Sequence, residues 1–351
     1  MAARILAVDA LRPDPGLIRE AADVLSAGQL VAFPTETVYG LGADALNAAA
    51  VDRVFEAKGR PADNPTIVHV STPAALDEIV TVIPPAARML IARLWPGPLT
   101  LVLPAAPTVP LVTRGGLPTV AVRMPSHAVA LALIAAAGRP VAAPSANRSG
   151  RPSPTTAQHV RDDLGDAVSI ILDAGPTPVG VESTVLDLAG EGPVLLRPGG
   201  VPLEMLERLL GPVAIAPPGA ASLLVRSPGT RYRHYAPHAK VVLVEVPQQR
   251  ATLELNAAIR RLWDQGLRVG AMVTAETAAA MPAGAVVRVM GSRSEAAAIA
   301  ANLFAQLREL DDAGLDAIVV EGIEERGLGR AVMDRLRRAA GAPDVGPGGI
   351  M

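Results

Sequence analysis

A strand and the polar turn after it decide the fold, and they read Leu30-Val31-Ala32-Phe33-Pro34-Thr35-Glu36-Thr37-Val38-Tyr39-Gly40-Leu41-Gly42. The four apolar residues predict a buried strand, which the proline and the hydroxyl-rich residues end. Gly40 and Gly42 imitate a dinucleotide-binding fingerprint, but polar residues separate them from the strand that should lead directly into them. We therefore expect these glycines to form a close-packed turn.

Short strands and helices continue on both sides of this stretch, which indicates an α/β domain over residues 1–210. Half of the chain is hydrophobic but only 2% is aromatic, so the core must be built from Ala, Val, Leu and Ile, as in sheets covered by helices. Helices are expected at 14–27, 47–57, 73–80 and 84–94, and strands at 66–70, 99–103, 120–123, 141–143, 169–173, 184–188 and 194–197.

A second domain follows a break in composition. Residues 211–239 are rich in proline and glycine and predict a linker. Beyond it, strands at 241–246, 268–273, 285–290 and 317–320 alternate with helices at 250–265, 294–313 and 328–340. This alternation predicts a smaller, doubly wound Rossmann-like domain over 240–345, with a frayed tail at 346–351. Its first strand runs into Pro247-Gln248-Gln249 without a glycine, so we do not expect it to bind a nucleotide by itself.

Composition excludes several classes of protein. A net charge of -2 gives no general attraction to nucleic acid or to an anionic membrane. Without cysteine there is no disulfide framework, thiolate zinc site or cysteine nucleophile, and the histidines show no metal spacing. The apolar stretch after Arg4 is cut by Asp9, and prolines interrupt the uncharged run 94–113. We expect a cytoplasmic protein that has no membrane partner and no metal-ligand set of its own.

Lys58 is one of only two lysines beside thirty arginines, and it begins the run Lys58-Gly59-Arg60-Pro61. Its retention suggests a need for a compact, rotatable ammonium rather than a planar guanidinium. Positive charge on a stiff loop is suited to holding phosphate oxygens. The alternative is chance survival on the surface, which is the better interpretation for Lys240.

Polar residues also follow or end several of the expected strands. They lie in 34–42, at Arg123, in 144–150, in 182–184 and in 197–199. Ligands of α/β sheets bind at the ends of the strands, and hydroxyls, amides and arginines gathered there suit an anionic ligand.

Several motifs, taken in order along the chain, resemble one family. They are Pro34 to Gly42, Lys58-Gly59-Arg60-Pro61, His69, Trp95-Pro96-Gly97-Pro98-Leu99-Thr100, Val122-Arg123-Met124-Pro125, Pro144-Ser145-Ala146-Asn147 with Ser149-Gly150, and Leu196-Arg197-Pro198-Gly199. Together they resemble the L-threonylcarbamoyladenylate synthase family with its YrdC-like domain, and the C-terminal half resembles its two-domain form. The resemblance implies an open twisted α/β sheet with a large concave, positively charged cavity.

The resemblance also implies a reaction, in which L-threonine, bicarbonate and ATP with Mg²⁺ give threonylcarbamoyl-AMP and pyrophosphate. Downstream tRNA-modifying proteins would use the product to make threonylcarbamoyladenosine, whereas the acidic balance argues against direct tRNA binding. The implied catalytic residues are Lys58, Arg60, Ser145 and Asn147. Those implied for L-threonine are Thr37, His69, Arg123, Ala143 and Ser183. Those implied for ATP are Lys58, Arg60, Asn64, Thr119, Ser145, Asn147, Ser153, Arg197 and Tyr235.

Some alternatives stay open at this point. For His69, a structural histidine whose hydrogen bonds are satisfied inside its strand is an equally good interpretation. For Arg123 the ligand interpretation is favoured, because burying an arginine without an anion would be costly. Two other functions compete, an RNA-binding module that uses the basic cavity and a related carbamoyltransferase with another acceptor. In the linker, 227–238 is expected to fold over the adenylate as a lid, with Tyr232, Arg233 and Tyr235 as its contacts.

Overall fold

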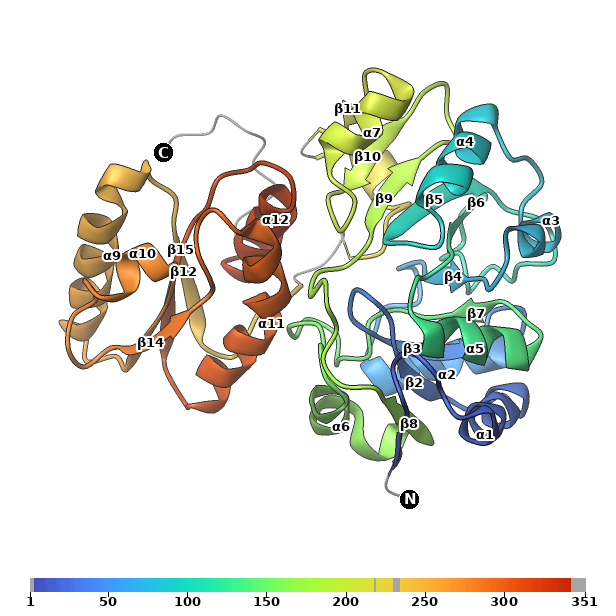
Figure 1. Ribbon diagram of the computed structural model, residues 1–351, viewed down its shortest axis with the longest axis horizontal. Coiled ribbons are helices and arrows are strands. Elements are labelled where there is room, and N and C mark those ends of the chain that lie inside the picture. The colour runs from blue at the N-terminus through green and yellow to red at the C-terminus, as the bar shows by residue number, and fades with distance from the viewer. Residues whose placement is uncertain (1–2, 218, 230–233, 342–351) are drawn as a thin grey trace. The chain divides into compact units, whose positions relative to one another are not determined.

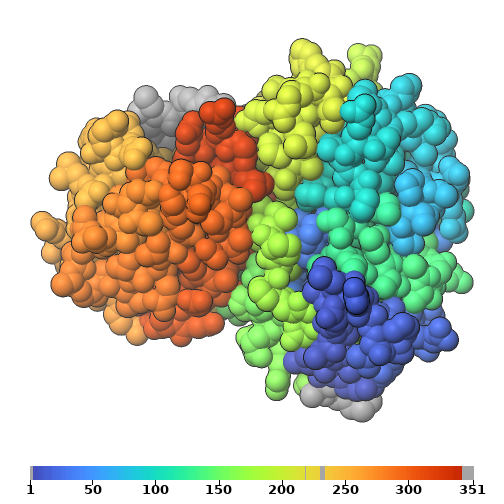
Figure 2. Space-filling view, in the orientation of Figure 1, coloured from blue at the N-terminus to red at the C-terminus, as the bar shows by residue number. Residues whose placement is uncertain are grey.

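The computed structural model describes residues 3–217, 219–229 and 234–341, and these form two compact units. The first unit comprises Met1–Ser149 and Ser153–Arg231, and the second comprises Gly150–Pro152 and Tyr232–Met351. Each unit has its own sheet (Figure 1), and within each unit the atoms are closely packed (Figure 2). The predicted combination of a large α/β sheet and a smaller parallel sheet is confirmed.

The sheet of the first unit has eleven strands among the described residues, with both parallel and antiparallel pairs. In spatial order they are β1 (Arg4–Ala7), β8 (Ile170–Asp173), β2 (Val31–Pro34), β3 (Tyr39–Asp44), β7 (Val141–Ala142), β4 (Ile67–His69), β6 (Thr119–Arg123), β5 (Leu99–Pro104), β9 (Thr184–Asp187), β10 (Val194–Arg197) and β11 (Ala214–Ile215). The last of these lies in the stretch that the composition marks as a linker, and it pairs with β10.

Helices pack on this sheet, and the predicted ones are present. Asp14 and Asn47 cap α1 and α2 as their sequence positions suggest. The helices of the unit are α1 (Pro15–Ser26), α2 (Ala48–Lys58), α3 (Leu76–Ile79) after the 3₁₀ turn η1 (Pro73–Ala75), α4 (Pro85–Leu94), α5 (Ala128–Ala137), α6 (Ala157–Leu164) followed by the 3₁₀ turn η2 (Gly165–Ala167), α7 (Leu203–Leu210) and α8 (Ala221–Leu224).

The turn expected at Gly40 and Gly42 is wrong, because both glycines lie inside strand β3. The strand pairs antiparallel with β2, with Phe33 opposite Gly40. A Cβ atom on Gly42 would lie 2.8 Å from Phe33 Cε1 and 3.0 Å from Val141 Cγ1. The glycines do serve close packing, but they serve it by letting a strand lie against a ring.

The second unit is a Rossmann-like domain, as the alternation predicts. Its four described strands are all parallel, in the order β12 (Lys240–Val244), β15 (Ala317–Glu321), β13 (Val269–Val273) and β14 (Val286–Val289). Helices α9 (Gln248–Trp263) and α10 (Ala275–Ala278) cover one face, and α11 (Ala296–Asp312) and α12 (Gly329–Ala339) cover the other (Figure 1).

Three residues from the middle of the chain, Gly150–Pro152, belong to this second unit. Ala236 N donates to Gly150 O at 2.8 Å, and the guanidinium of Arg308 donates to Pro152 O. Arg151 pairs with Asp311, with 3.4 Å between Nη2 and Oδ2. The chain therefore passes three times between the units.

No described helix is long and apolar enough to cross a membrane. Of the residues expected to form a lid, Tyr232 and Arg233 lie outside the described residues. Pro228, near its start, accepts a hydrogen bond from Arg197 Nη1 at 2.9 Å in the first unit. The lid stays a prediction.

Candidate active site

Buried polar side chains lie at the ends of several strands in the first unit. Thr37 follows β2, His69 ends β4 and Arg123 ends β6. Strands β4 and β6 are parallel and in register, so His69 lies directly beside Arg123. Ser183 and Arg197, at the start of β9 and the end of β10, complete the group. The strand ends where the sequence places a ligand thus carry several buried polar groups, which are costly without partners.

Arg123 is the centre of one cluster. Its Nη2 lies 2.6 Å from Glu36 Oε2, and its Nη1 donates to Thr37 Oγ1 at 3.0 Å. Its Nε donates to Gly97 O at 3.2 Å. These contacts fix the plane of the guanidinium, so an anion meets a preorganised group.

Glu36 is a site residue to which neither the sequence pattern nor the resemblance assigns a role. Its side chain is buried, yet Oε1 accepts no hydrogen bond from any described residue. A buried carboxylate oxygen with no donor is unfavourable, which points to a cationic or N–H group of a ligand. The only sequence signal was an acidic residue inside a hydroxyl-rich turn.

His69 is buried and uncharged. Its Nδ1 lies 3.1 Å from Ile67 O and donates to it. Burial first, and then the positive charge of Arg123, lower the pKa of His69 from 6.5 to about 3. The neutral ring can accept or donate a hydrogen bond, so a ligand contact and a structural role inside the strand both agree with this geometry.

The lowered pKa of His69 predicts a loss of stability in acid. In the unfolded chain the imidazole binds a proton near pH 6.5, whereas in the folded chain it does so only near pH 3. The free energy of unfolding should therefore decline as pH falls through this window, by up to roughly 1.4 kcal/mol per pH unit. Urea unfolding across the window should show a shallower decline for His69→Gln than for the wild type or for the exposed control His238→Gln. Equal slopes for the wild type and His69→Gln would contradict a lowered pKa of His69.

Ser183 and Arg197 form a second cluster. The hydroxyls of Ser183 and Thr100 lie 2.7 Å apart. Arg197 Nη2 donates to Ser183 O at 2.9 Å and to Ser183 Oγ at 3.2 Å. The serine hydroxyl is therefore held in one place, beside a second fixed guanidinium.

Lys58 is the last residue of α2, and Gly59 caps the helix in the left-handed conformation. Lys58 is 3% exposed, and its Nζ donates to Ser145 O and Asn147 O, both at 2.5 Å. Ser145 Oγ in turn donates to Asn147 Oδ1 at 2.6 Å. The structure brings together three of the four predicted catalytic residues, and surface survival of Lys58 by chance is excluded by its burial.

Arg60, the fourth, bends back over its own loop. Its Nη2 donates to Pro65 O at 2.8 Å and its Nε to Asn64 O at 3.3 Å. Asn64 is fully buried, yet neither its amide oxygen nor its amide nitrogen has a partner among the described residues. An amide with both atoms unmet favours a ligand contact, as the resemblance implies for ATP.

The remaining predicted residues occupy varied places. Thr119 begins β6, and Ala143 donates its N–H to Ile67 O at 2.9 Å. The Ser153 hydroxyl donates to the Glu182 carboxylate. Tyr235 belongs to the second unit, where its ring stacks on Phe304 at 5.3 Å between centroids. The ATP contact of Tyr235 stays a prediction.

Comparisons with known proteins agree with the motifs. Residues 23–199 match the family described as "Telomere recombination", and residues 201–341 match the threonylcarbamoyl-AMP synthase C-terminal domain. The threonylcarbamoyl-AMP synthase of Pyrococcus abyssi is 51% identical, with 92% of this chain and 94% of that protein covered. The enzyme of the same name from Bacillus subtilis is 45% identical, with 95% of each chain covered.

The fold agrees equally well with a solved structure. The crystal structure of Pyrococcus abyssi Sua5 complexed with L-threonine superposes with a TM-score of 0.91 at 49% identity, covering 96% of this chain and 97% of that one. Both the motifs of the first unit and the second unit are thus accounted for by one kind of protein. The chain belongs to the threonylcarbamoyl-AMP synthase family, in its two-domain form.

Proposed function

We propose that this protein converts L-threonine, bicarbonate and ATP into L-threonylcarbamoyl-AMP and pyrophosphate, for the modification of tRNA by other proteins. The observation that carries the proposal is the fixed Arg123 beside Glu36, whose Oε1 has no donor among the described residues, because an amino acid presents a carboxylate and an ammonium only a few ångströms apart. The relatives support it through their names.

In this proposal the Arg123 cluster binds L-threonine. Arg123 receives the carboxylate, and Thr37, His69, Ser183 and backbone at Ala143 surround the rest of the molecule. A neutral His69 adds no positive charge to the pocket, so the guanidinium groups of Arg123 and Arg197 supply it. The paired hydroxyls of Ser183 and Thr100 offer a polar partner for the threonine side chain.

The other residues of the site bind the nucleotide in this proposal. Lys58 and Arg60 neutralise phosphate charge, and Asn64 supplies an amide with free donors and acceptors. Among the described residues, no group of three or more His, Asp or Glu is placed so that it could hold a metal ion. Mg²⁺ would then enter with ATP and be held chiefly by phosphate oxygens. The other residues proposed for ATP are Thr119, Ser145, Asn147, Ser153, Arg197 and Tyr235.

The reaction requires the reactants to be positioned and does not require a nucleophilic side chain. The threonine nitrogen and bicarbonate form a carbamate with loss of water, and a carbamate oxygen attacks the α-phosphorus while the bond to pyrophosphate breaks. The site residues orient the two reactants and neutralise charge in a low-dielectric setting, which are the main contributions to phosphoryl-type transfer.

Pyrophosphate release tests this function. Release should require ATP, L-threonine and bicarbonate together. An RNA-binding module would release none, and a carbamoyltransferase relative would prefer another acceptor amine. Release that is independent of threonine would overturn the proposal.

We also expect the site to discriminate against L-valine, which is nearly the same shape as L-threonine but lacks its hydroxyl. A pocket that pairs this hydroxyl leaves polar groups unmet when valine binds, at a cost of about 1 to 3 kcal/mol. The ratio kcat/KM for valine should be lower by roughly tenfold to a hundredfold. Equal values for the two amino acids would refute the assigned pocket.

A further inference from the structure

The second unit contains a cavity that the proposed function does not use. Its volume is about 510 Å³, within the usual range for small-ligand sites. Residues 245–249, after β12, and 321–325, at the end of β15 and after it, line much of it. Ala251, Arg293, Met333 and Arg337 complete its polar and apolar wall.

The cavity lies where the topology of the unit favours a ligand. Strands β12 and β15 are neighbours. The chain leaves β12 into α9 on one face of the sheet and leaves β15 into α12 on the other (Figure 1). The loops therefore diverge at the carboxyl ends of adjacent parallel strands, which is the switch point where open α/β sheets bind ligands.

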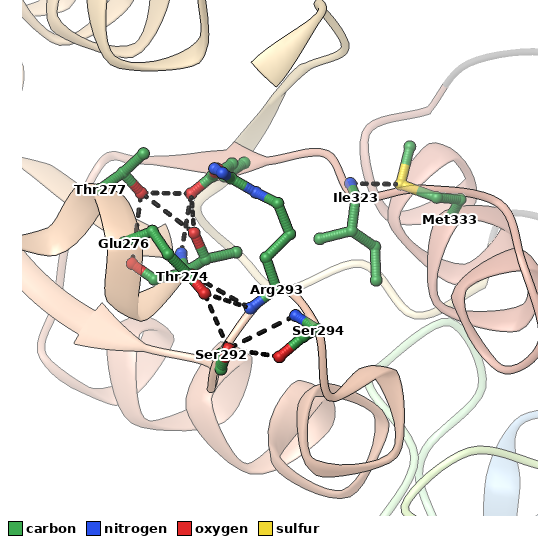
Figure 3. A network of polar contacts seen from close by, with 9 residues as sticks. Thr274, Glu276, Thr277, Ser292, Arg293, Ser294, Ile323 and Met333 are labelled. Atoms are coloured by element: carbon green, nitrogen blue, oxygen red, sulfur yellow. Dashed lines mark hydrogen bonds and ion pairs between the residues drawn. The ribbon is translucent and has the colours of Figure 1, made fainter. Parts of the chain in front are cut away.

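One side of the cavity presents a fixed guanidinium. Arg293 pairs with Glu321, whose carboxylate is 1% exposed and accepts from Thr274 N at 2.8 Å, from Thr274 Oγ1 at 3.0 Å and from Thr277 Oγ1 (Figure 3). The backbone N of Arg293 donates to Glu276 at 3.0 Å. Arg293 is thus held at its head and at its backbone, and among the described residues only its Nη2 has a side-chain partner.

The start of α9 is a second feature of the lining that attracts negative charge. No side chain caps this sixteen-residue helix, whose first residues, Gln248 and Gln249, line the cavity. The first N–H groups of a helix have no partner inside it and attract negative charge. The turn contains Pro247 and no glycine, so a pyrophosphate cannot approach the backbone as in dinucleotide sites. A carboxylate is the smaller anion that fits.

Another part of the lining carries an excess of negative charge. The guanidinium of Arg337 is shared between Glu245, at 2.6 Å, and Glu325. Glu324, which also lines the cavity, is exposed and makes no ion pair among the described residues. Four glutamates thus face two arginines across the whole lining. This part of the lining favours a cation, which an ammonium supplies.

We propose that this cavity binds a small zwitterion of the α-amino acid class, independently of the active site. The carboxylate faces Arg293 and the start of α9, the ammonium faces Glu324 and the Glu245–Glu325 pair, and the side chain lies against Val246, Ile323 and Met333. The second unit then senses an amino acid while the first unit performs the chemistry.

Calorimetric titration of the full chain with each common L-α-amino acid tests this. L-Threonine is expected to bind the first unit as well, so the panel is run on the wild type and on the double variant Arg293→Gln/Glu321→Gln, which removes both charges of the buried pair together. Only binding that the double variant loses is assigned to the cavity. For such a ligand, affinity should fall by at least roughly tenfold in the double variant and by up to about fivefold in Glu324→Gln.

Two controls sharpen the result. Glu254→Gln removes the same charge from α9 outside the cavity, where Glu254 pairs with Arg250, and it should leave the affinity unchanged. The methyl ester and the N-acetyl derivative of the bound amino acid each lose one charge, and both should bind more weakly. The proposal is overturned if no amino acid binds at millimolar concentration, if the double variant binds as the wild type does, or if either derivative binds equally well.

Discussion

Replacing Lys58 by arginine should abolish most synthesis although the positive charge is kept. Its ammonium is buried and donates to two carbonyl groups of the loop that carries Ser145 and Asn147. A planar guanidinium is larger and cannot direct its donors to both carbonyls from the end of α2. We expect kcat/KM for pyrophosphate release to fall by roughly a hundredfold or more, as when a fixed charge-stabilising donor is lost.

Lys240→Arg provides the matched control, because this lysine is exposed at the start of β12. It should retain wild-type activity and stability. Urea unfolding of both variants separates a folding defect from a catalytic one, since Lys58→Arg should lose more activity than its fraction of folded protein explains. Wild-type turnover by Lys58→Arg would show that any cation suffices at this position.

Replacing Glu36 by glutamine should raise KM for L-threonine by roughly tenfold to a hundredfold, the range for a charge-assisted hydrogen bond. The carboxylate lies 2.6 Å from Arg123, and its second oxygen has no donor among the described residues until a ligand supplies one. KM for ATP should change little, because the proposed phosphate contacts lie elsewhere in the site.

Breaking a buried ion pair also destabilises a protein, by about 3 to 5 kcal/mol. The variant Glu36→Gln/Arg123→Gln, which removes both charges, should recover part of that stability and still fail to bind threonine. Glu56→Gln, an exposed change on α2, should affect neither property. If Glu36→Gln unfolds more easily but keeps the wild-type KM for threonine, Glu36 is only a structural partner of Arg123.

The sequence predicts the main elements of the second unit, where polar and apolar residues alternate with a clear period. It misses the amphipathic helices α6 and α7 of the first unit, because eight residues are too few to show a helical period. The second unit has amphipathic helices between short apolar strands, and its parallel sheet follows from that alternation. Helix α5, Ala128–Ala137, was not predicted, because a segment without polar residues has no face to reveal its period. The sequence predicts a turn at strand β3 because glycines are unfavourable in strands unless a neighbour such as Phe33 fills the space.

The candidate site was predictable as a set of residues but not as a set of contacts. Strand ends and the resemblance pointed to Arg123 and Thr37, which are 86 positions apart and form a hydrogen bond. The pairing of Glu36 with Arg123 depends on which strands become neighbours, and no local pattern encodes that. The unmet amide of Asn64 is likewise visible only once the surrounding chain is in place.

The passage of 150–152 through the second unit makes that unit a discontinuous domain. A shortened protein that ends after the last residue of the first unit would keep Gly150–Pro152 but lose Arg308, Asp311 and the backbone N–H of Ala236, which hold them. This tripeptide begins three positions after Asn147, so such a deletion also disturbs the loop that carries Ser145 and Asn147. Unfolding of the two halves should for the same reason be cooperative, and a ligand on that loop should raise the melting temperature of both halves together.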